Sequence, residues 1–260
     1  MNKKNIVEKI LEYKKLNQFK KYMIFKTQQK NNNSYSPDIN GKKYLVLFAC
    51  HCDSQLKLET IRKNLIYYAF ENMHKIVINT TKLQYNSSVS KICSRYNNTK
   101  YVEIDNSGYY DFGKWLHVLK NINYNEYDYI IFTNDSFIIH NSINHFFNLT
   151  AKHNLELYGY NDSTQNKYHY QSYLFSLRKD AIQKFIDKVD NPNLIIKNQS
   201  DVIKYFELDM TNWFKTHKSF LKIGNCRLDI GHNIFFTNDG LYLPLKKSGL
   251  LPFTKLKRIT

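Results

Sequence analysis

Four short apolar runs punctuate the first half of this chain, and each is followed by a polar segment and a helical pattern. The runs are YLVLFA, KIVIN, YVEI and YDYIIF, at residues 44–49, 75–79, 101–104 and 127–132. Continuous apolar runs of this length are typical of strands buried on both faces. Because strands and helices alternate, the pattern predicts an α/β fold with a mostly parallel central sheet flanked by helices.

Helices are expected where apolar residues recur at steps of three and four. In the first half, the expected helices begin near Leu58, Val89 and Asp111. The second half is more mixed, with one further strand at residues 173–177 and helices near residues 179–189 and 201–217.

The N-terminal segment differs in composition from the rest of the chain. Apolar residues recur at helical spacing through residues 4–25, opposite a face rich in lysine, and an Asn-rich linker composition follows in residues 31–43. We therefore expect an N-terminal amphipathic helix and linker in residues 1–40 and one compact domain in residues 41–260. Two interpretations of the helix stay open: it docks on the domain with its basic side in solvent, or it contacts an anionic membrane or a partner.

The net charge is +16, from 38 Lys and Arg against 22 Asp and Glu. Such a charge is compatible with nucleic acid, an anionic membrane or phosphate-bearing small molecules as partners. The excess is almost all lysine in a chain rich in Asn, Ile and Tyr, as an AT-rich genome would produce. Because arginine, the usual reader of bases, is scarce, we expect no nucleic-acid partner.

The four cysteines, Cys50, Cys52, Cys93 and Cys226, are scattered, which favours a reduced compartment. No apolar run approaches the roughly 18 residues of a membrane helix, and the first residues show no signal-peptide core. We expect a cytoplasmic location, with the N-terminal helix as the candidate for peripheral membrane contact.

Polar residues gather where the first, third and fourth predicted strands end, at residues 51–54, 105–108 and 133–136. In open parallel sheets, ligands bind beyond the carboxyl ends of the strands. The sequence contains no G-x-G-x-x-G, P-loop, G-x-S-x-G or H-E-x-x-H motif, which weakens dinucleotide-binding, kinase and most hydrolase interpretations.

The segment YDYIIFTNDSF looks like the strand and DxD motif of glycosyltransferases with the GT-A (nucleotide-diphospho-sugar transferase) fold. NSGYYDFGKW, TNDSF, YGYNDS and HYQSYLFSLRK together resemble the rhamnan-synthesis-F-like glycosyltransferases of bacterial polysaccharide loci and large DNA viruses. The resemblance spans residues 44–255. It implies transfer of a sugar from a UDP-, GDP- or dTDP-linked donor to a hydroxyl of a glycan or glycoprotein acceptor, in polysaccharide or glycoprotein glycan synthesis.

The resemblance also implies which residues bind the donor. The positions carried over are His51, Asp53, Asn106, Gly108, Asp111, Lys114, Asn134, Asp135, Ser136, His169, Gln171, Ser172 and Lys255. His51 and Asp53 fall where this fold holds the base and ribose, and Lys114 and Lys255 are expected at the diphosphate. Simpler interpretations stay open: His51 and Asp53 belong to a loop that caps the next helix, and Asp111 is a helix N-cap.

The DxD position reads Asn134-Asp135-Ser136, so only its middle residue is a carboxylate. The resemblance implies Mn²⁺ or Mg²⁺ bound by Asp135, with His232 as a late ligand. The single carboxylate departs from the DxD pattern and puts metal dependence in doubt, because one carboxylate binds a hard cation more weakly than two.

The helix segment FELDMTNWF resembles the one that carries the catalytic base of inverting enzymes with this fold, with Glu207 at the base position and Asp209 two residues later. Such a carboxylate takes the proton of the acceptor hydroxyl. Because residues two apart on a helix face different directions, we expect only one of them to serve.

Two other classes of protein stay open. One is a noncatalytic nucleotide-sugar-binding or glycan-binding relative, in which Asp135→Ala would leave biological activity intact. The other is a basic nucleic-acid-binding α/β protein, which would bind DNA or RNA in a strongly salt-dependent way.

Overall fold

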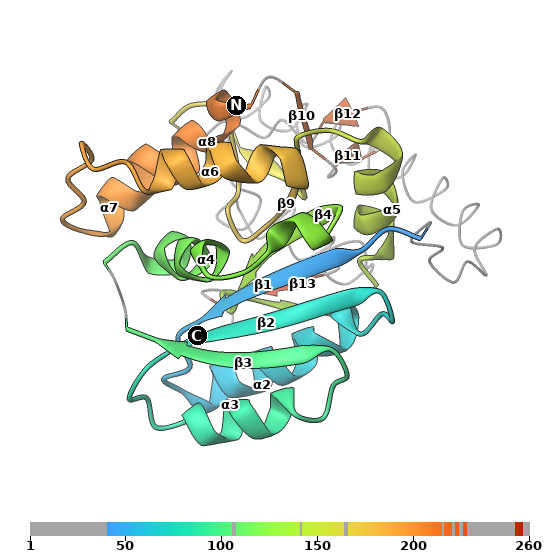
Figure 1. The fold of residues 1–260 in the computed structure, drawn as a ribbon, viewed down its shortest axis with the longest axis vertical. Helices are drawn as coiled ribbons and strands as arrows, with labels where there is room; N and C mark the ends of the chain where they lie inside the picture. Colours follow the sequence, from blue (N-terminus) through green and yellow to red (C-terminus); the bar gives the residue numbers. More distant parts are fainter. Residues whose placement is uncertain are drawn as a thin grey trace, which may run out of the picture.

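The computed structural model describes residues 41–105, 108–140, 142–163, 166–214, 216–219, 222–223, 226–227 and 253–256. Its centre is a seven-stranded sheet with the strand order β10-β6-β9-β4-β1-β2-β3 (Figure 1). The strands are β1 (Tyr44–Cys50), β2 (Met73–Thr80), β3 (Thr99–Ile104), β4 (Tyr129–Asn134), β6 (Leu157–Gly159), β9 (Leu174–Arg178) and β10 (His217–Ser219). Only β9 runs antiparallel to its neighbours in this sheet. The predicted α/β fold with a mostly parallel sheet is confirmed.

The strands of the first half follow the apolar runs of the sequence. β1 is buried along its whole length and lies between β2 and β4, to both of which it is parallel. Its side chains alternate between two hydrophobic clusters, with Val46 and Phe48 in one and Leu45 and Leu47 in the other. A strand with a core on each face must be apolar at every position, which explains the run.

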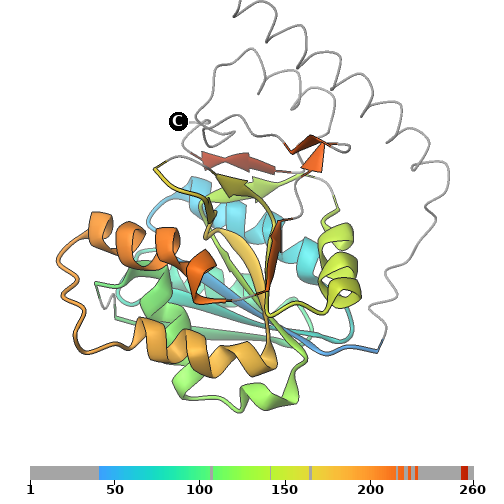
Figure 2. The same ribbon diagram turned by 90° about the horizontal axis from the view of Figure 1, so that it is seen from above.

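Helices cover both faces of the sheet, so the protein has three layers (Figures 1 and 2). One face carries α2 (Gln55–Leu65), α3 (Asn86–Cys93) and α5 (Asn144–His153), whose apolar residues share one cluster. The other carries α4 (Tyr110–Lys120), α6 (Ile182–Val189) and α8 (Leu208–Trp213). Short 3₁₀ turns occupy Ile66–Tyr68, Tyr124–Glu126 and Lys179–Ala181. Helix α5 was not among the predicted elements.

The helix predicted for residues 201–217 is partly wrong. It begins as α7 (Gln199–Val202), continues as a π-helical turn at Ile203–Glu207 and ends with α8 at Trp213. Phe214 is extended, and β10 then pairs with β6. Hydrogen bonds to a distant strand override the local helical pattern here, which sequence periodicity does not register.

Three two-stranded ribbons complete the described fold. They are β5 (Phe137–Ile139) with β13 (Phe253–Lys255), β7 (Asp162–Ser163) with β8 (His169–Tyr170), and β11 (Lys222–Ile223) with β12 (Cys226–Arg227). In Figure 2 the red β13 lies beside the yellow-green β5. This pairing places Lys255 opposite Phe137, directly after the fourth strand's polar turn.

The predicted N-terminal helix and linker, residues 1–40, lie outside the described residues, so this part of the domain division stays a prediction. Within the described ranges, no helix is both long and apolar enough to cross a membrane.

Candidate active site

Asp135 lies where β4 ends, beside the end of β1. The two strands are parallel and pair Ala49 with Asn134, so their carboxyl ends meet at the same edge of the sheet. The backbone N–H of Asp135 donates to the Ala49 carbonyl at 3.2 Å. Its carboxylate Oδ2 accepts the backbone N–H of His51 at 2.8 Å, and the residue is only 7% exposed. The two polar strand ends therefore lie side by side, and the site that they are predicted to share stays a prediction.

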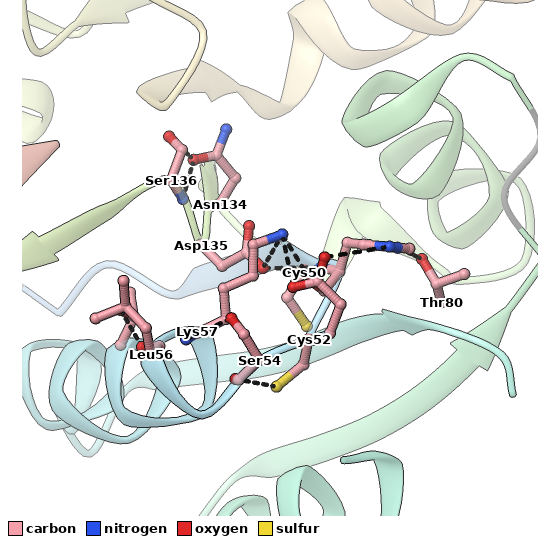
Figure 3. A network of polar contacts seen from close by, with 12 residues as sticks. Cys50, Cys52, Ser54, Leu56, Lys57, Thr80, Asn134, Asp135 and Ser136 are labelled. Atoms are coloured by element: carbon pink, nitrogen blue, oxygen red, sulfur yellow. Dashed lines mark hydrogen bonds and ion pairs between the residues drawn. The ribbon is translucent and has the colours of Figure 1, made fainter. Parts of the chain in front are cut away.

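Lys57 joins this group and was missed by sequence reasoning. Its ammonium Nζ donates to the His51 carbonyl at 2.8 Å, and lies 3.5 Å from Asp53 Oδ1 and 3.8 Å from Asp135 Oδ2 (Figure 3). Lys57 stands in the first turn of α2, whose N-cap is Ser54. The available signal was its spacing, because a residue four after Asp53 on a helix reaches back to it. The loop that contains His51 and Asp53 does cap this helix, through Ser54.

Asn134 and Ser136 bond to each other rather than projecting as two further ligands. Asn134 Oδ1 accepts from the backbone N–H and hydroxyl of Ser136, at 3.1 and 2.6 Å (Figure 3). Asn134 Nδ2 donates to Asp111 Oδ2 at 2.9 Å. The turn therefore presents Asp135 alone as a carboxylate.

Asp111 is in the first turn of α4 and makes no N-cap hydrogen bond, so the N-cap interpretation is not what the structure shows. The residue is half-buried, and its carboxyl accepts from Asn134. Burial raises the pKa of Asp111 to about 6, Lys114 opposes the rise and the Asp135 carboxylate adds to it. Asp111 thus shares the electrostatic environment of Asp135.

Lys114 is buried, and its Nζ donates to the Cys50 carbonyl at the end of β1 at 2.7 Å. A buried ammonium aimed at a strand end differs from the exposed lysine of an ordinary helix surface. His51 donates or accepts through Nδ1 with Thr80 Oγ1 at 2.9 Å. Burial lowers the pKa of His51, and Lys57 and Lys114 lower it further.

Gly108 precedes α4 with a φ of +77°, as a tight turn after β3 requires. Two of the predicted residues, Asn106 and His232, lie outside the described residues.

A second carboxylate group forms around Glu207, the last residue of the π-helical turn. Glu207 Oε2 accepts the hydroxyl of Ser172 at 2.7 Å, and Oε1 lies 3.8 Å from His169 Nε2. Asp209 points elsewhere and pairs with Lys167 in a more exposed position. Single π-helical turns recur at functional sites because they reorient the side chains that follow. The expected separation of Glu207 from Asp209 is present.

The hydrogen bonds of His169 hold its ring in one orientation. Nδ1 lies 2.8 Å from the Lys167 carbonyl, which only accepts, so Nδ1 carries the proton. Nε2 then accepts from Gln171 Nε2 at 2.9 Å. Both residues are buried, so the imidazole is held in a fixed orientation beside Glu207.

Further contacts connect the residues around Asp135 with those around Glu207. Lys255 Nζ donates to Ser136 Oγ at 3.1 Å and lies 3.8 Å above the ring of Tyr173, the neighbour of Ser172. Phe206, which precedes Glu207, packs against Tyr109 at the start of α4, with ring centroids 5.7 Å apart. The structure therefore brings the Asp135 turn, the His169–Ser172 segment and the Glu207 helix together.

The residues around Asp135 do not fit a divalent cation. Mg²⁺ and Mn²⁺ prefer several oxygen ligands, usually with more than one carboxylate. Here the carboxylate of the turn has a backbone N–H and an ammonium beside it. Within the described residues, no three His, Cys, Asp or Glu side chains converge to hold a metal ion.

No model of a known protein family matches the chain. One stretch of 123 residues is 34% identical to Virulence protein VirA of Vibrio anguillarum (strain ATCC 68554 / 775), covering 44% of this chain. The match covers 38% of that protein, so the chain spans well under half the length of this relative.

Solved structures with similar folds share little sequence with this chain. A 4-diphosphocytidyl-2C-methyl-D-erythritol synthase from Anaerococcus prevotii is 12% identical, with 71% of this chain and 89% of that chain covered and a TM-score of 0.49. A mannosyltransferase from Pyrobaculum calidifontis, in complex with GDP-Man and Mn²⁺, is 8% identical, with 64% and 55% covered and a TM-score of 0.45. The glycosyltransferase GlyE of Streptococcus pneumoniae is 15% identical, with 68% and 45% covered and a TM-score of 0.43. Similarities this weak do not decide what this chain does.

Proposed function

We propose that the chain is a glycosyltransferase that moves a sugar from a nucleotide-diphosphate-sugar donor to a hydroxyl of a glycan acceptor. One observation carries the proposal: Asp135, with the ammonium groups of Lys57, Lys114 and Lys255 around its turn, is connected through Lys255 and Tyr173 to the segment that holds Glu207. Diphosphate binding needs positive charge, and sugar transfer needs a nearby base. The arrangement supplies both at one edge of a parallel sheet, where such folds bind ligands.

In the proposed reaction, Glu207 takes the proton of the acceptor hydroxyl as its oxygen attacks the anomeric carbon. The bond between that carbon and the diphosphate oxygen breaks, and the nucleoside diphosphate leaves with the electron pair. Ser172 holds Oε2 of Glu207, which leaves Oε1 to receive the proton. This role requires inversion at the anomeric carbon, since retaining enzymes do not need such a base.

The remaining donor residues take roles consistent with their positions. His51 and Asp53 follow β1 and are proposed at the base and ribose, while Lys114 and Lys255 are proposed at the diphosphate. His169 and Ser172 lie beside Glu207, and Gln171 contacts His169, so we place these three at the transferred sugar.

The finer expectations stay predictions. They are an acceptor in polysaccharide or glycoprotein glycan synthesis and a cytoplasmic, membrane-peripheral location. No step of the proposed reaction passes through a metal, because the described residues around Asp135 do not fit one.

The test is release of nucleoside diphosphate from a panel of UDP-, GDP- and dTDP-sugars, with and without glycan acceptors. We expect acceptor-dependent release with at least one donor and its loss in Asp135→Ala. A panel without turnover in which donors still bind and raise the melting temperature would indicate a noncatalytic binding protein. If the panel shows no turnover and no donor binds, the proposal is rejected.

A further inference from the structure

The carboxylate at the DxD position already has a cation beside it. The Lys57 ammonium lies 3.8 Å from Asp135 Oδ2, and its side chain is 25% exposed while that of Asp135 is 10% exposed. Ion pairs on an open surface are weak because water and salt screen them. This pair is largely sheltered, so the two charges interact more strongly.

Lys57 is held in place from three sides. Its Nζ donates to the His51 carbonyl at 2.8 Å, and the backbone N–H of His51 in turn donates to Asp135 at 2.8 Å. Asp53 lies on the other side of the ammonium at 3.5 Å. Only the contact with the carbonyl has hydrogen-bond length, so two N–H bonds of Lys57 remain available for the oxygens of a ligand.

The helix that carries Lys57 is fastened to the strand that follows Asp135. Asn64, buried on α2, donates to the Phe137 carbonyl at 2.7 Å and accepts the Ile139 N–H at 2.8 Å. Phe137 and Ile139 belong to β5, two residues beyond Asp135. The backbone of α2 is therefore held in place relative to the Asp135 turn, and the His51 carbonyl positions the Lys57 ammonium.

A divalent cation bound to Asp135 would lie within a few ångströms of the Lys57 ammonium. Two like charges at that separation in a sheltered site repel each other strongly. The ammonium already lies beside the carboxylate and can do what the metal does elsewhere, which is to offset the negative charge of a diphosphate. Lys114 and Lys255 add two further ammonium groups around the same turn.

We infer that Lys57 replaces the divalent cation at this site, so that the chain binds nucleoside diphosphates without a metal. The inference rests on the proposed function and names the group that neutralises the leaving diphosphate. It assigns Lys57 to direct contact with the phosphate oxygens and Asp135 to holding Lys57.

The experiment is isothermal titration calorimetry of the full chain with UDP, GDP and dTDP, in excess EDTA and in millimolar Mn²⁺. We expect at least one of them to bind in EDTA, and Mn²⁺ to change its affinity by less than about tenfold. Lys57→Met should weaken binding in EDTA by about 10- to 100-fold, the range for hydrogen bonds to charged groups. Lys63→Met, which removes the same charge from the exposed side of the same helix, should bind like the wild type.

Binding that appears only with Mn²⁺ overturns this inference and leaves the proposed function standing. Absence of binding in both conditions overturns the proposed function and this inference together. Wild-type affinity of a folded Lys57→Met protein also overturns the inference. The comparison of EDTA with Mn²⁺ uses the wild-type chain alone, so it decides the question even if Lys57→Met does not fold.

Discussion

The two carboxylates of the candidate site have different partners. Asp135 is flanked by a backbone N–H and the Lys57 ammonium, and two more lysines stand around its turn. Glu207 accepts the hydroxyl of Ser172 and lies 3.8 Å from the imidazole of His169, whose Nδ1 proton is directed to a backbone carbonyl. The same functional group therefore lies beside an ammonium in one place and beside a hydroxyl and an imidazole in the other.

This difference teaches how one sheet edge can divide two tasks. A carboxylate paired with an ammonium arranges positive charge for an anionic ligand. A carboxylate with one oxygen held by a hydroxyl keeps its second oxygen for a proton. The assignment of Asp135 to binding and Glu207 to proton transfer predicts that substitutions at the two sites change different measured quantities.

Glu207→Gln should have the largest effect. The amide keeps the size of the side chain and its contact with Ser172 but does not take up a proton, so kcat should fall by about 10²- to 10⁴-fold. Nucleoside diphosphate affinity, measured by calorimetry, should stay within a few-fold of wild type.

Asp209→Asn is the matched control for that substitution, because it removes a carboxylate two residues away that pairs with Lys167 on the surface. Its kcat should be close to wild type. Equal losses in both variants would place the base elsewhere on this helix.

Ser172→Ala should have a smaller effect on the same quantity. It removes the 2.7 Å hydrogen bond that orients Glu207, at a cost of about 1.5–3 kcal/mol for a bond to a charged group. We expect kcat to fall by at least about tenfold in steady-state kinetics, while the affinity for the nucleoside diphosphate in calorimetry stays unchanged. A change in nucleoside diphosphate affinity alone would instead assign Ser172 to the Asp135 group.

Asp111→Asn should change stability, and in a pH-dependent way. Burial raises the pKa of Asp111 to about 6 from an ordinary value near 3.8, so the folded protein binds this proton more tightly than the unfolded chain. The resulting stabilisation is complete below pH 3.8 and is lost as pH rises through 6. The wild type therefore loses stability between pH 4 and pH 8, and the variant does not. The free energy of unfolding of the variant minus that of the wild type should be higher at pH 8 than at pH 4 by on the order of 1 kcal/mol.

Urea unfolding of both proteins at the two pH values measures this difference. Parallel pH profiles of the wild type and the variant would show that Asp111 ionises as freely in the folded state as in the unfolded chain.

Sequence alone predicted the elements that have a recognisable pattern of apolar residues, which are mainly those of the first half of the chain. The strand at 44–49 is a run of apolar residues because β1 has a core on each face, and Asp135 was found because polar residues at a strand end mark a ligand site. β10, β13 and helix α5 were not predicted. β10 and β13 are three residues each and form through pairing with distant partners, which leaves no period in the sequence.

The candidate site shows the same division. Motif positions such as Asp135 and Glu207 are visible in the sequence, whereas the partner that gives Asp135 its environment is not. Lys57 is one lysine among many in the sequence. It lies beside Asp135 because the hydrogen bonds of Asn64 to β5 hold α2 against the end of β4.

The structure also offers a rival location for a ligand. A cavity of about 390 Å³ lies at the opposite edge of the sheet, where β1, β2 and β3 begin, and is lined by Leu45, His74, Lys75, Ile76, Asn98, Thr99, Lys100 and Tyr127. Asp135 instead follows the carboxyl end of β4.

A crystal structure of the chain soaked with the tightest-binding nucleoside diphosphate, in EDTA, tests the account most directly. We predict the diphosphate at the carboxyl edge, with its oxygens within hydrogen-bond distance of Lys57 Nζ and beside the Asp135 turn. A nucleotide bound in the cavity between Leu45, Ile76 and Tyr127, or one held at Asp135 only through a metal ion, would contradict it.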